Sequence, residues 1–251
     1  MQTVALLDGD IFAYQAAAAA QTKHTFGDEV HYDVDEVKAK RVLLESLERI
    51  QKKLKQDTTV VCLSCSTETG WRRAIMPGYK AHRDPAAKPQ LLGAMKDLLR
   101  NMHTTYERPT LEADDVMGIL STAAKGPFPG RKVIVSIDKD MKTIPGWLYN
   151  PDKDTKPRQF SVDEANYWHL YQTLVGDATD GYKGCPGIGP KRAEFMLQVR
   201  AEDRWPNVVA AFEVKGLTEE DALLQARVAR ICRVTDYDFD RKEVKLWTPS
   251  K

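Results

Sequence analysis

The sequence has few cysteines and histidines, and they form no evident zinc or nucleophile site. Four cysteines and five histidines are spread over 251 residues. Cys62 and Cys65 make one CxxC pair, but Cys185 and Cys232 stand alone, whereas structural zinc sites usually combine two such pairs. The scattered histidines give neither a Ser-His-Asp nor a Cys-His arrangement. We therefore expect no zinc, and reduced thiols as in a cytosolic protein.

Long hydrophobic runs are also lacking. No apolar run approaches the roughly 18 residues that a membrane-spanning helix needs. The opening residues, MQTVALLDGD, lack the basic and then apolar segments of a signal peptide. We therefore expect a cytoplasmic protein without a membrane partner.

The chain has little net charge, but the charge is unevenly distributed. A net charge of +1 would argue against a nucleic-acid partner if it were evenly spread. Between Trp71 and Arg100, however, seven Lys or Arg residues stand against two acids. With 42% hydrophobic residues, the chain can bury a full core in one large or two modest domains.

Apolar segments alternate with amphipathic ones along the first part of the chain. The pattern predicts buried strands at 3–7, 58–64 and 132–137, and helices at 10–21, 34–55, 88–102 and 111–125. This alternation predicts an α/β fold with a mostly parallel sheet and helices on both faces. After Ser161 the pattern is mainly helical, so we expect a domain boundary near Lys156. The segment VKLWTP, 244–249, is predicted to be a late strand that returns to the sheet.

Nine carboxylates fall into four short clusters. They are Asp8 and Asp10; Glu112, Asp114 and Asp115; Asp138 and Asp140; and Asp177 and Asp180. Two clusters directly follow predicted strands, where ligands bind in open parallel sheets. Singly, each cluster could cap a helix. Together, like charges about 5 Å apart would repel by roughly 3 kcal/mol a pair, so we predict divalent cations, Mg²⁺ or Mn²⁺.

The segment GDATDGYKGCPGIGPKRA, 176–193, adds a glycine-rich hairpin to the last pair of acids. Gly184, Gly187 and Gly189 allow backbone N–H groups to approach one anion, and Lys191 and Arg192 open a helix whose N-terminus favours phosphate. This pattern predicts a helix-hairpin-helix that grips a nucleic-acid backbone, although a plain Pro/Gly turn is the alternative. Beside a metal site, the reaction expected is phosphodiester hydrolysis with two ions about 4 Å apart.

Five motifs in order carry a family resemblance: LLDGD, PGYKAHRD, LEADD, SIDKDM and GDATDGYKGCPGIGPKRA. Over roughly residues 4–196 the chain resembles the 5′ nucleases, which include flap endonucleases and 5′-3′ exonucleases, and it is most similar to the small exonucleases of lytic podophages. The resemblance implies a PIN-like nuclease domain at 1–156, with a basic arch around 66–90. It also implies a helix-hairpin-helix DNA-binding subdomain of the H3TH type, with the C-terminal strand, at 157–251.

The resemblance also implies roles for the acidic clusters. Ligands of a first Mg²⁺ or Mn²⁺, some through water, would be Asp8, Glu112, Asp114, Asp115 and Asp138. Ligands of a second ion would be Asp140, Asp177 and Asp180. Asp10 has no firm counterpart and is expected either to support the site or to cap a helix. A monovalent cation is expected at the helix-hairpin-helix.

The basic and glycine residues receive substrate roles from the same resemblance. Lys80 and Arg83, together with Asp8 and Asp138, are implied to be catalytic, because a Lys and an Arg of the arch face the scissile phosphate. Tyr79 is expected to stack on a terminal base or to pack within the loop. The implied DNA contacts are Tyr79, Lys80, Arg83, Arg72, Arg73, Gly184, Gly187, Gly189, Lys191 and Arg192.

One position departs from the family pattern. Most relatives have an Asp just after the second strand, where this chain has Cys65 and Ser66. Glu68 is the nearest carboxylate that could substitute, although an exposed loop acid is the simpler interpretation. We expect a weaker first metal site that prefers Mn²⁺ or needs more Mg²⁺.

The predicted function is metal-dependent, structure-selective cleavage of DNA from a 5′ end, as a 5′-3′ exonuclease or flap endonuclease. The expected partners are DNA with a 5′ end, flap or nick, an RNA-primed (RNA–DNA hybrid) end, and replication proteins. A role in phage DNA replication or recombination follows from the resemblance. The alternatives are a catalytically weak or inactive DNA-binding protein on the same fold, and a PIN-type ribonuclease.

Overall fold

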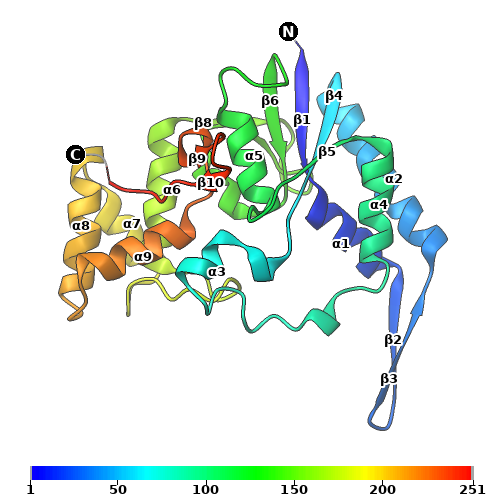
Figure 1. Ribbon diagram of the computed structural model, residues 1–251, viewed down its shortest axis with the longest axis horizontal. Coiled ribbons are helices and arrows are strands. Elements are labelled where there is room, and N and C mark those ends of the chain that lie inside the picture. Colours follow the sequence, from blue (N-terminus) through cyan, green and yellow to red (C-terminus); the bar gives the residue numbers. More distant parts are fainter. Residues whose placement is uncertain (1, 250–251) are drawn as a thin grey trace.

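A six-stranded sheet forms the centre of the protein (Figure 1). The computed structural model describes residues 2–249. The strand order is β5-β4-β1-β6-β7-β8. The strands are β1 (Thr3–Asp8), β4 (Thr58–Leu63), β5 (Thr104–Glu107), β6 (Arg131–Val135), β7 (Gly146–Tyr149) and β8 (Arg158–Phe160). All neighbours pair in parallel except β7 and β8. The predicted α/β class and its mostly parallel sheet are confirmed.

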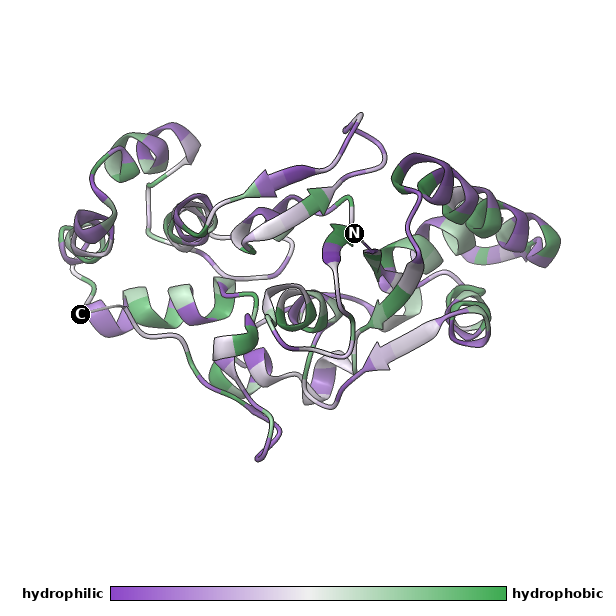
Figure 2. Ribbon diagram, turned by 90° about the horizontal axis from the view of Figure 1, so that it is seen from above, coloured by the Kyte–Doolittle hydropathy of each residue, from purple (hydrophilic) through white to green (hydrophobic). Residues whose placement is uncertain are grey.

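Helices cover both faces of this sheet. Alternate residues of β1 point to opposite faces, so Ala5 and Leu7 join one buried cluster while Val4 and Leu6 join the other. The first cluster packs under α1 (Gly9–Ala19), α2 (Glu36–Leu54) and α4 (Leu92–Met102), and the second packs under α5 (Ala113–Thr122). Figure 2 shows that these helices carry hydrophobic and hydrophilic residues together, as helices with one buried side do.

A helical unit lies beside the sheet (Figure 1). Its helices are α6 (Val162–Val175), α7 (Pro190–Leu197), α8 (Ala201–Glu213) and α9 (Glu219–Ala229). They enclose a separate core that includes Leu174, Ile188 and Phe212. The predicted helical character of this part of the chain is therefore seen.

The central sheet and the helical unit do not divide at the predicted boundary near Lys156. Strand β8 follows that position and still belongs to the central sheet. After α9 the chain also returns to the sheet, where Ile231, Cys232 and Tyr237 join the buried cluster under α5.

The C-terminal segment does not return to the central sheet as predicted. Of the predicted strand, 244–249, only Val244 lies in a strand, β10 (Glu243–Val244). This strand pairs with β9 (Tyr237–Asp238) in a separate two-stranded sheet. The physical reason is that Trp247 packs its ring against His169 and Trp205 of the helical unit.

A further hairpin was not predicted. Strands β2 (Gln21–Phe26) and β3 (Glu29–Val34) pair only with each other and extend away from the body of the molecule (Figure 1). The short elements that complete the chain are α3 (Trp71–Ile75) and the 3₁₀ helices at Thr67–Thr69, Pro85–Ala87, Lys139–Thr143 and Val234–Asp236. Among residues 2–249, no helix is both long enough and apolar enough to span a bilayer.

Candidate active site

A cleft of about 950 Å³ opens at the carboxyl ends of β1, β4 and β6. The arch, residues 66–90, runs along this side from the end of β4 to α4 (Figure 1). Eight of the nine clustered carboxylates line the cleft: Asp8, Asp10, Glu112, Asp114, Asp138, Asp140, Asp177 and Asp180. Acids from four distant segments thus share one cleft, which places them as the sequence analysis expected.

Asp8 is the most deeply buried of these carboxylates. It ends β1, caps α1 by accepting a hydrogen bond from the Ile11 amide, and accepts another from Ser136 Oγ at 2.7 Å. Burial and the charge of Asp10 nevertheless raise the pKa of Asp8 to about 7. Burial and the charge of Asp8 likewise raise the pKa of Asp114 well above its ordinary value. The strand ends therefore concentrate negative charge that these hydrogen bonds do not neutralise.

Asp138 and Asp140 continue this acidic surface after β6. The Asp140 amide donates to Asp138 Oδ1 at 2.8 Å, and Asp140 Oδ1 is buried without a hydrogen-bond partner. Burial raises the pKa of Asp138, and burial together with the charge of Asp138 raises the pKa of Asp140 to about 7. A buried, unpaired carboxylate oxygen that faces other acids suits a hard cation.

Asp177 and Asp180 come from the loop between α6 and α7. Asp177 Oδ1 accepts hydrogen bonds from the amides of Thr179 and Asp180, and its Oδ2 lies 3.3 Å from Lys139 Nζ. Burial disfavours the charged form of Asp177, but Lys139 offsets this, so the pKa of Asp177 is lowered. Asp180 pairs with Arg83, with 2.7 Å between Nη2 and Oδ1.

The arch places two side chains directly among the acids. Lys80 Nζ lies 2.6 Å from Glu112 Oε1 and 3.5 Å from Asp180 Oδ2. The Tyr79 hydroxyl lies 2.9 Å from a carboxylate oxygen of each of the same two residues. Tyr79 is only 3% exposed and packs in a buried cluster with Tyr182, Val228 and Ala229, so its ring is not presented to a base in this conformation.

Arg72 and Asp115 differ from their predicted roles. The Arg72 side chain is 3% exposed and Asp115 is fully buried. Two hydrogen bonds of 2.7 and 2.8 Å join the guanidinium to the carboxylate, and Asp115 also accepts from Trp71 Nε1 and the Cys232 amide. Burial opposes the charged carboxylate, but Arg72 outweighs it and lowers the pKa of Asp115.

The Arg72–Asp115 pair is therefore a structural link rather than part of the cleft's acidic surface. Arg72 also donates to the carbonyl oxygens of Val228 and Arg230, which joins the arch to the end of α9. Its donors face the protein interior, so the expectation that Arg72 contacts DNA is corrected. Of the five acids expected to serve the first ion, some through water, Asp115 is the one that does not line the cleft.

Arg73 and Arg83 of the arch also line the cleft. Arg73 is half-buried and donates from Nε to the Tyr79 carbonyl, which fixes the turn that carries Lys80. The Arg83 side chain is 47% exposed and reaches Asp180 and the Thr179 carbonyl. Of the arch cations, Arg83 is thus open to a ligand, whereas Lys80 is covered.

The glycine hairpin is anchored to the end of α6. Gly184 has φ +64°, and a Cβ there would lie 2.4 Å from the Gly176 nitrogen, so only glycine fits. The Cys185 amide donates to the Leu174 carbonyl at 2.8 Å. Gly187 is exposed in the turn with φ +74°, and Gly189 is the N-cap of α7.

The cationic end of α7 is open to solvent. Pro190 begins the helix, and Lys191 and Arg192 are exposed in its first turn. Free amides and basic side chains at a helix N-terminus favour a phosphate. The hairpin geometry expected for a backbone grip is therefore present.

Three residues that contact the cleft acids received no individual role in the sequence analysis. Ser136 orients Asp8, Lys139 pairs with Asp177, and Lys96 of α4 lies 2.6 Å from Asp10. Ser136 and Lys139 belong to the SIDKDM motif, 136–141, so their position was a usable signal. Lys96 had none, since it resembles any lysine on an amphipathic helix.

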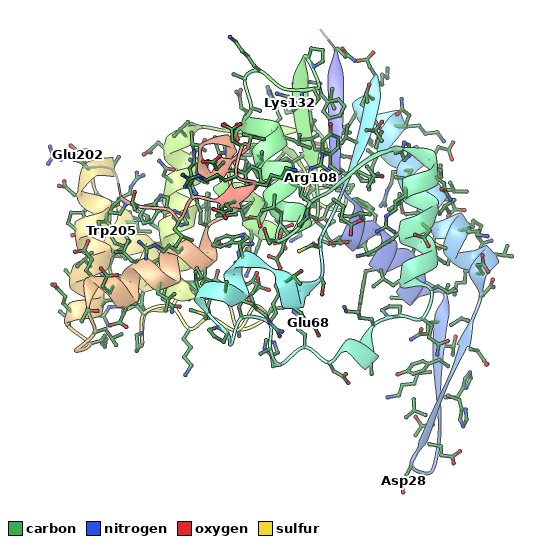
Figure 3. The ribbon with its side chains drawn as sticks, viewed as in Figure 1. Asp28, Glu68, Arg108, Lys132, Glu202 and Trp205 are labelled. Atoms are coloured by element: carbon green, nitrogen blue, oxygen red, sulfur yellow. The ribbon has the colours of Figure 1, made fainter. Side chains whose placement is uncertain are left out.

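The position after β4 is occupied by residues that are poor cation ligands. Cys65 and Ser66 line the cleft, and burial is the main reason that the pKa of the Cys65 thiol is raised. Glu68 is exposed near α3 on the same side of the molecule (Figure 3). Among residues 2–249, no three acidic, histidine or cysteine side chains already enclose one point as a coordination shell does. Lys80 and Tyr79 instead lie between Glu112 and Asp180.

Comparison with known proteins places the chain in a family. The family model for the 5′-3′ exonuclease N-terminal resolvase-like domain matches residues 3–147. The chain is 30% identical over 284 aligned positions to an exonuclease of Escherichia phage T7, covering 98% of this chain and 93% of that protein. It is also 30% identical over 212 positions to the flap endonuclease Xni of Vibrio campbellii, covering 73% and 76%.

A solved structure shows the same fold. The bacteriophage T5 flap endonuclease, in a complex with DNA and metal ions, superimposes with a TM-score of 0.58 at 16% identity, covering 91% of this chain and 89% of that one. The sequence relatives and the family model confirm the resemblance that the five motifs indicated. The chain therefore belongs to the 5′-3′ exonuclease family.

Proposed function

We propose that this nuclease hydrolyses DNA phosphodiesters at 5′ ends and flaps, and that it needs divalent cations to do so. The observation that carries the proposal is the meeting of acids from four separate segments in one cleft, beside Lys80 and Arg83. The raised pKa values of Asp8, Asp114 and Asp140 indicate a site whose negative charge lacks compensation. A polyanionic substrate could not approach such a surface without cations.

The donor set fits two hard cations, Mg²⁺ or Mn²⁺. We assign Asp8, Glu112, Asp114 and Asp138 to the first ion and Asp140, Asp177 and Asp180 to the second. When bound, such ions lower the pKa of a coordinated water and stabilise the leaving oxygen. Asp115 would position Glu112 for the first ion. Its Oδ2 accepts a hydrogen bond from the Glu112 amide at 3.2 Å, and it binds Arg72, whose Nη1 lies 3.0 Å from Glu112 Oε2.

Lys80 and Arg83 supply positive charge to the reacting phosphate. In the structure both cations pair with Asp180, and Lys80 also pairs with Glu112. Divalent metal ions bound to those carboxylates would leave the Lys80 ammonium and the Arg83 guanidinium available to phosphate oxygens. Lys80 then stabilises the developing charge, and Arg83 orients the phosphate through paired N–H donors.

The hairpin around Gly187 and the N-terminus of α7 would hold the DNA backbone. Lys191 and Arg192 are exposed there beside the backbone amides of the hairpin, and groups of both kinds are typical phosphate contacts. We therefore infer recognition by backbone and by the presence of a 5′ end, flap or nick. The same grip would admit an RNA-primed 5′ end, which makes primer removal during phage DNA replication a candidate role.

The test is cleavage and binding of a labelled 5′ flap by Asp138→Ala. Cleavage should be lost while binding in Ca²⁺ is retained, because Asp138 lies in the acidic cleft and not in the hairpin. Asp28→Ala is the control, since Asp28 lies at the tip of the β2–β3 hairpin (Figure 3) and should leave both unchanged. Normal cleavage by Asp138→Ala in Mg²⁺ would contradict the assignment.

A further inference from the structure

Asp10 and Lys96 form an ion pair inside the cleft. Asp10 Oδ1 lies 2.6 Å from Lys96 Nζ of α4, and Asp10 Oδ2 accepts a hydrogen bond from the Ser64 amide at 3.0 Å. The two side chains are 25% and 22% exposed, and both line the cleft. Asp10 therefore stands at the carboxyl end of β4, although it belongs to α1.

Gly9 explains how a residue of α1 reaches the end of β4. A Cβ on Gly9 would lie 2.6 Å from Val61 Cγ1 and 2.7 Å from Leu63 Cδ2. Without that carbon, the first turn of α1 can lie directly on β4, and the next side chain, Asp10, extends past the strand end. Asp8, Gly9 and Asp10 thus act as one unit that places two carboxylates over adjacent strand ends.

The Asp10 carboxylate is also linked to the first turn of α5. The Ser64 amide holds Asp10, and Ser64 Oγ accepts a hydrogen bond from the Ala113 amide at 2.8 Å. Ala113 lies between Glu112 and Asp114. Cys65 and Ser66, which follow Ser64, provide no carboxylate of their own, so Asp10 is the acid that occupies this strand end.

Asp10 is not the residue that caps α1. Capping of α1 is done by Asp8, whose side chain accepts from the Ile11 amide. Asp10 instead lines the cleft together with Asp8 and Asp114. A carboxylate placed against another buried carboxylate costs stability unless a cation compensates it.

We propose that Asp10 is a further carboxylate of the first metal site, and that Lys96 is its counter-ion until a divalent cation binds. This inference rests on the proposed function. Asp10 would face the cation directly or through a coordinated water, and the cation would replace the Lys96 ammonium as its partner. Removal of Asp10 and removal of Lys96 must then change cation affinity in opposite directions.

The experiment is a Mn²⁺ titration of the whole protein by calorimetry and by electron paramagnetic resonance, without substrate. Asp10→Asn should weaken binding by about tenfold or more, in the range seen when groups around a metal site are altered. Lys96→Met should strengthen binding several-fold. In the double variant, Lys96→Met should have no further effect, because its action depends on Asp10.

Lys40→Met is the matched control for loss of one positive charge. Lys40 pairs with Glu36 at 2.6 Å on the exposed side of α2 and lies outside the cleft, so its loss should leave Mn²⁺ affinity unchanged. If circular dichroism shows that Asp10→Asn does not fold, the Mn²⁺ affinity of Lys96→Met alone tests the proposal. An affinity of Lys96→Met within twofold of the wild type would overturn the proposal.

The two proposals fail in different ways. A wild-type protein that binds no Mn²⁺ would overturn the proposed function, and this inference with it. A wild type that binds Mn²⁺ and loses it in Asp138→Ala, while Asp10→Asn and Lys96→Met bind normally, would overturn only the role of Asp10 and Lys96.

Discussion

Arg72 and Asp115 form a buried, two-point ion pair, with N–O distances of 2.7 and 2.8 Å. Arg72 comes from the arch and Asp115 from α5. Arg72 also donates to the carbonyl of Val228, in the last turn of α9, and to that of Arg230, which directly follows α9. The pair therefore connects three parts of the chain that all contribute to the cleft.

Loss of one partner of this pair should be strongly destabilising. Arg72→Ala leaves a buried, uncompensated Asp115, which we expect to lower the free energy of unfolding by about 3–5 kcal/mol. Arg49→Ala is the control, because Arg49 forms an exposed pair with Asp152 and should cost about 1 kcal/mol or less. Urea denaturation measures both. Equal losses for the two variants would show that Arg72 is not a structural link.

Lys80 should matter for turnover and not for metal loading. Lys80→Met removes an ammonium that lies 2.6 Å from Glu112, so Mn²⁺ should bind at least as tightly as in the wild type. The rate of flap cleavage at saturating metal should fall by about 100- to 1000-fold, the range for loss of one donor to transition-state charge. Lys53→Met, an exposed change on α2, is the control. A cleavage rate within threefold of the wild type would remove Lys80 from the catalytic machinery.

The acids of the cleft should make stability depend on pH when metal is absent. The pKa values of Asp8 and Asp140 are raised from 3.8 to about 7, so the folded chain holds these protons more tightly than the unfolded chain. Their contribution to stability is complete below about pH 4 and is lost as the pH rises to about 7. In EDTA, the unfolding temperature of the wild type should therefore fall across this window more steeply than that of Asp8→Asn.

Metal should reverse this trend, because cations bind the deprotonated carboxylates. The rise in unfolding temperature on adding Mg²⁺ should be larger at pH 8 than at pH 6. Calorimetry in two buffers of different ionisation enthalpy should show proton release on binding near pH 7. Equal stabilisation by Mg²⁺ at both pH values would be inconsistent with the raised pKa values.

The exposed cations of α7 should contribute to DNA affinity without sequence preference. Lys191→Ala and Arg192→Ala should each reduce the slope of log affinity against log salt by about one, since each removes one phosphate contact. The same loss is expected on flaps of unrelated sequence. An unchanged slope in both variants would place the DNA backbone elsewhere.

Much of the scaffold could be predicted from local sequence. The strands β1, β4 and β6 are apolar runs buried on both faces, which is the pattern of central parallel strands. Strands β5, β7 and β8 have three or four residues each and lie at or next to the edges of the sheet, so they have little local signal. The exposed β2–β3 hairpin has no buried face to impose a hydrophobic pattern.

The candidate site was only partly predictable for a related reason. Two of the four acid clusters could be placed because they follow strands, β1 and β6, whose ends meet at one edge. Asp114 and Asp115 are neighbours on a helix, yet only Asp114 lines the cleft while Asp115 turns inward to Arg72. That difference depends on how α5 rotates against the arch, which tertiary packing decides. Lys96 could not be predicted, because its partner Asp10 is far away in sequence.

Metal-dependent cleavage at a 5′ end is the central claim, and one assay tests it most directly. The wild-type protein is incubated with a flap DNA labelled at its 5′ end, in Mg²⁺, in Mn²⁺ or in EDTA, and product lengths are resolved on a sequencing gel. The predicted result is release of labelled nucleotides or short oligonucleotides with either ion and an intact substrate in EDTA. Cleavage in EDTA, or an intact 5′ end with both ions, would contradict it.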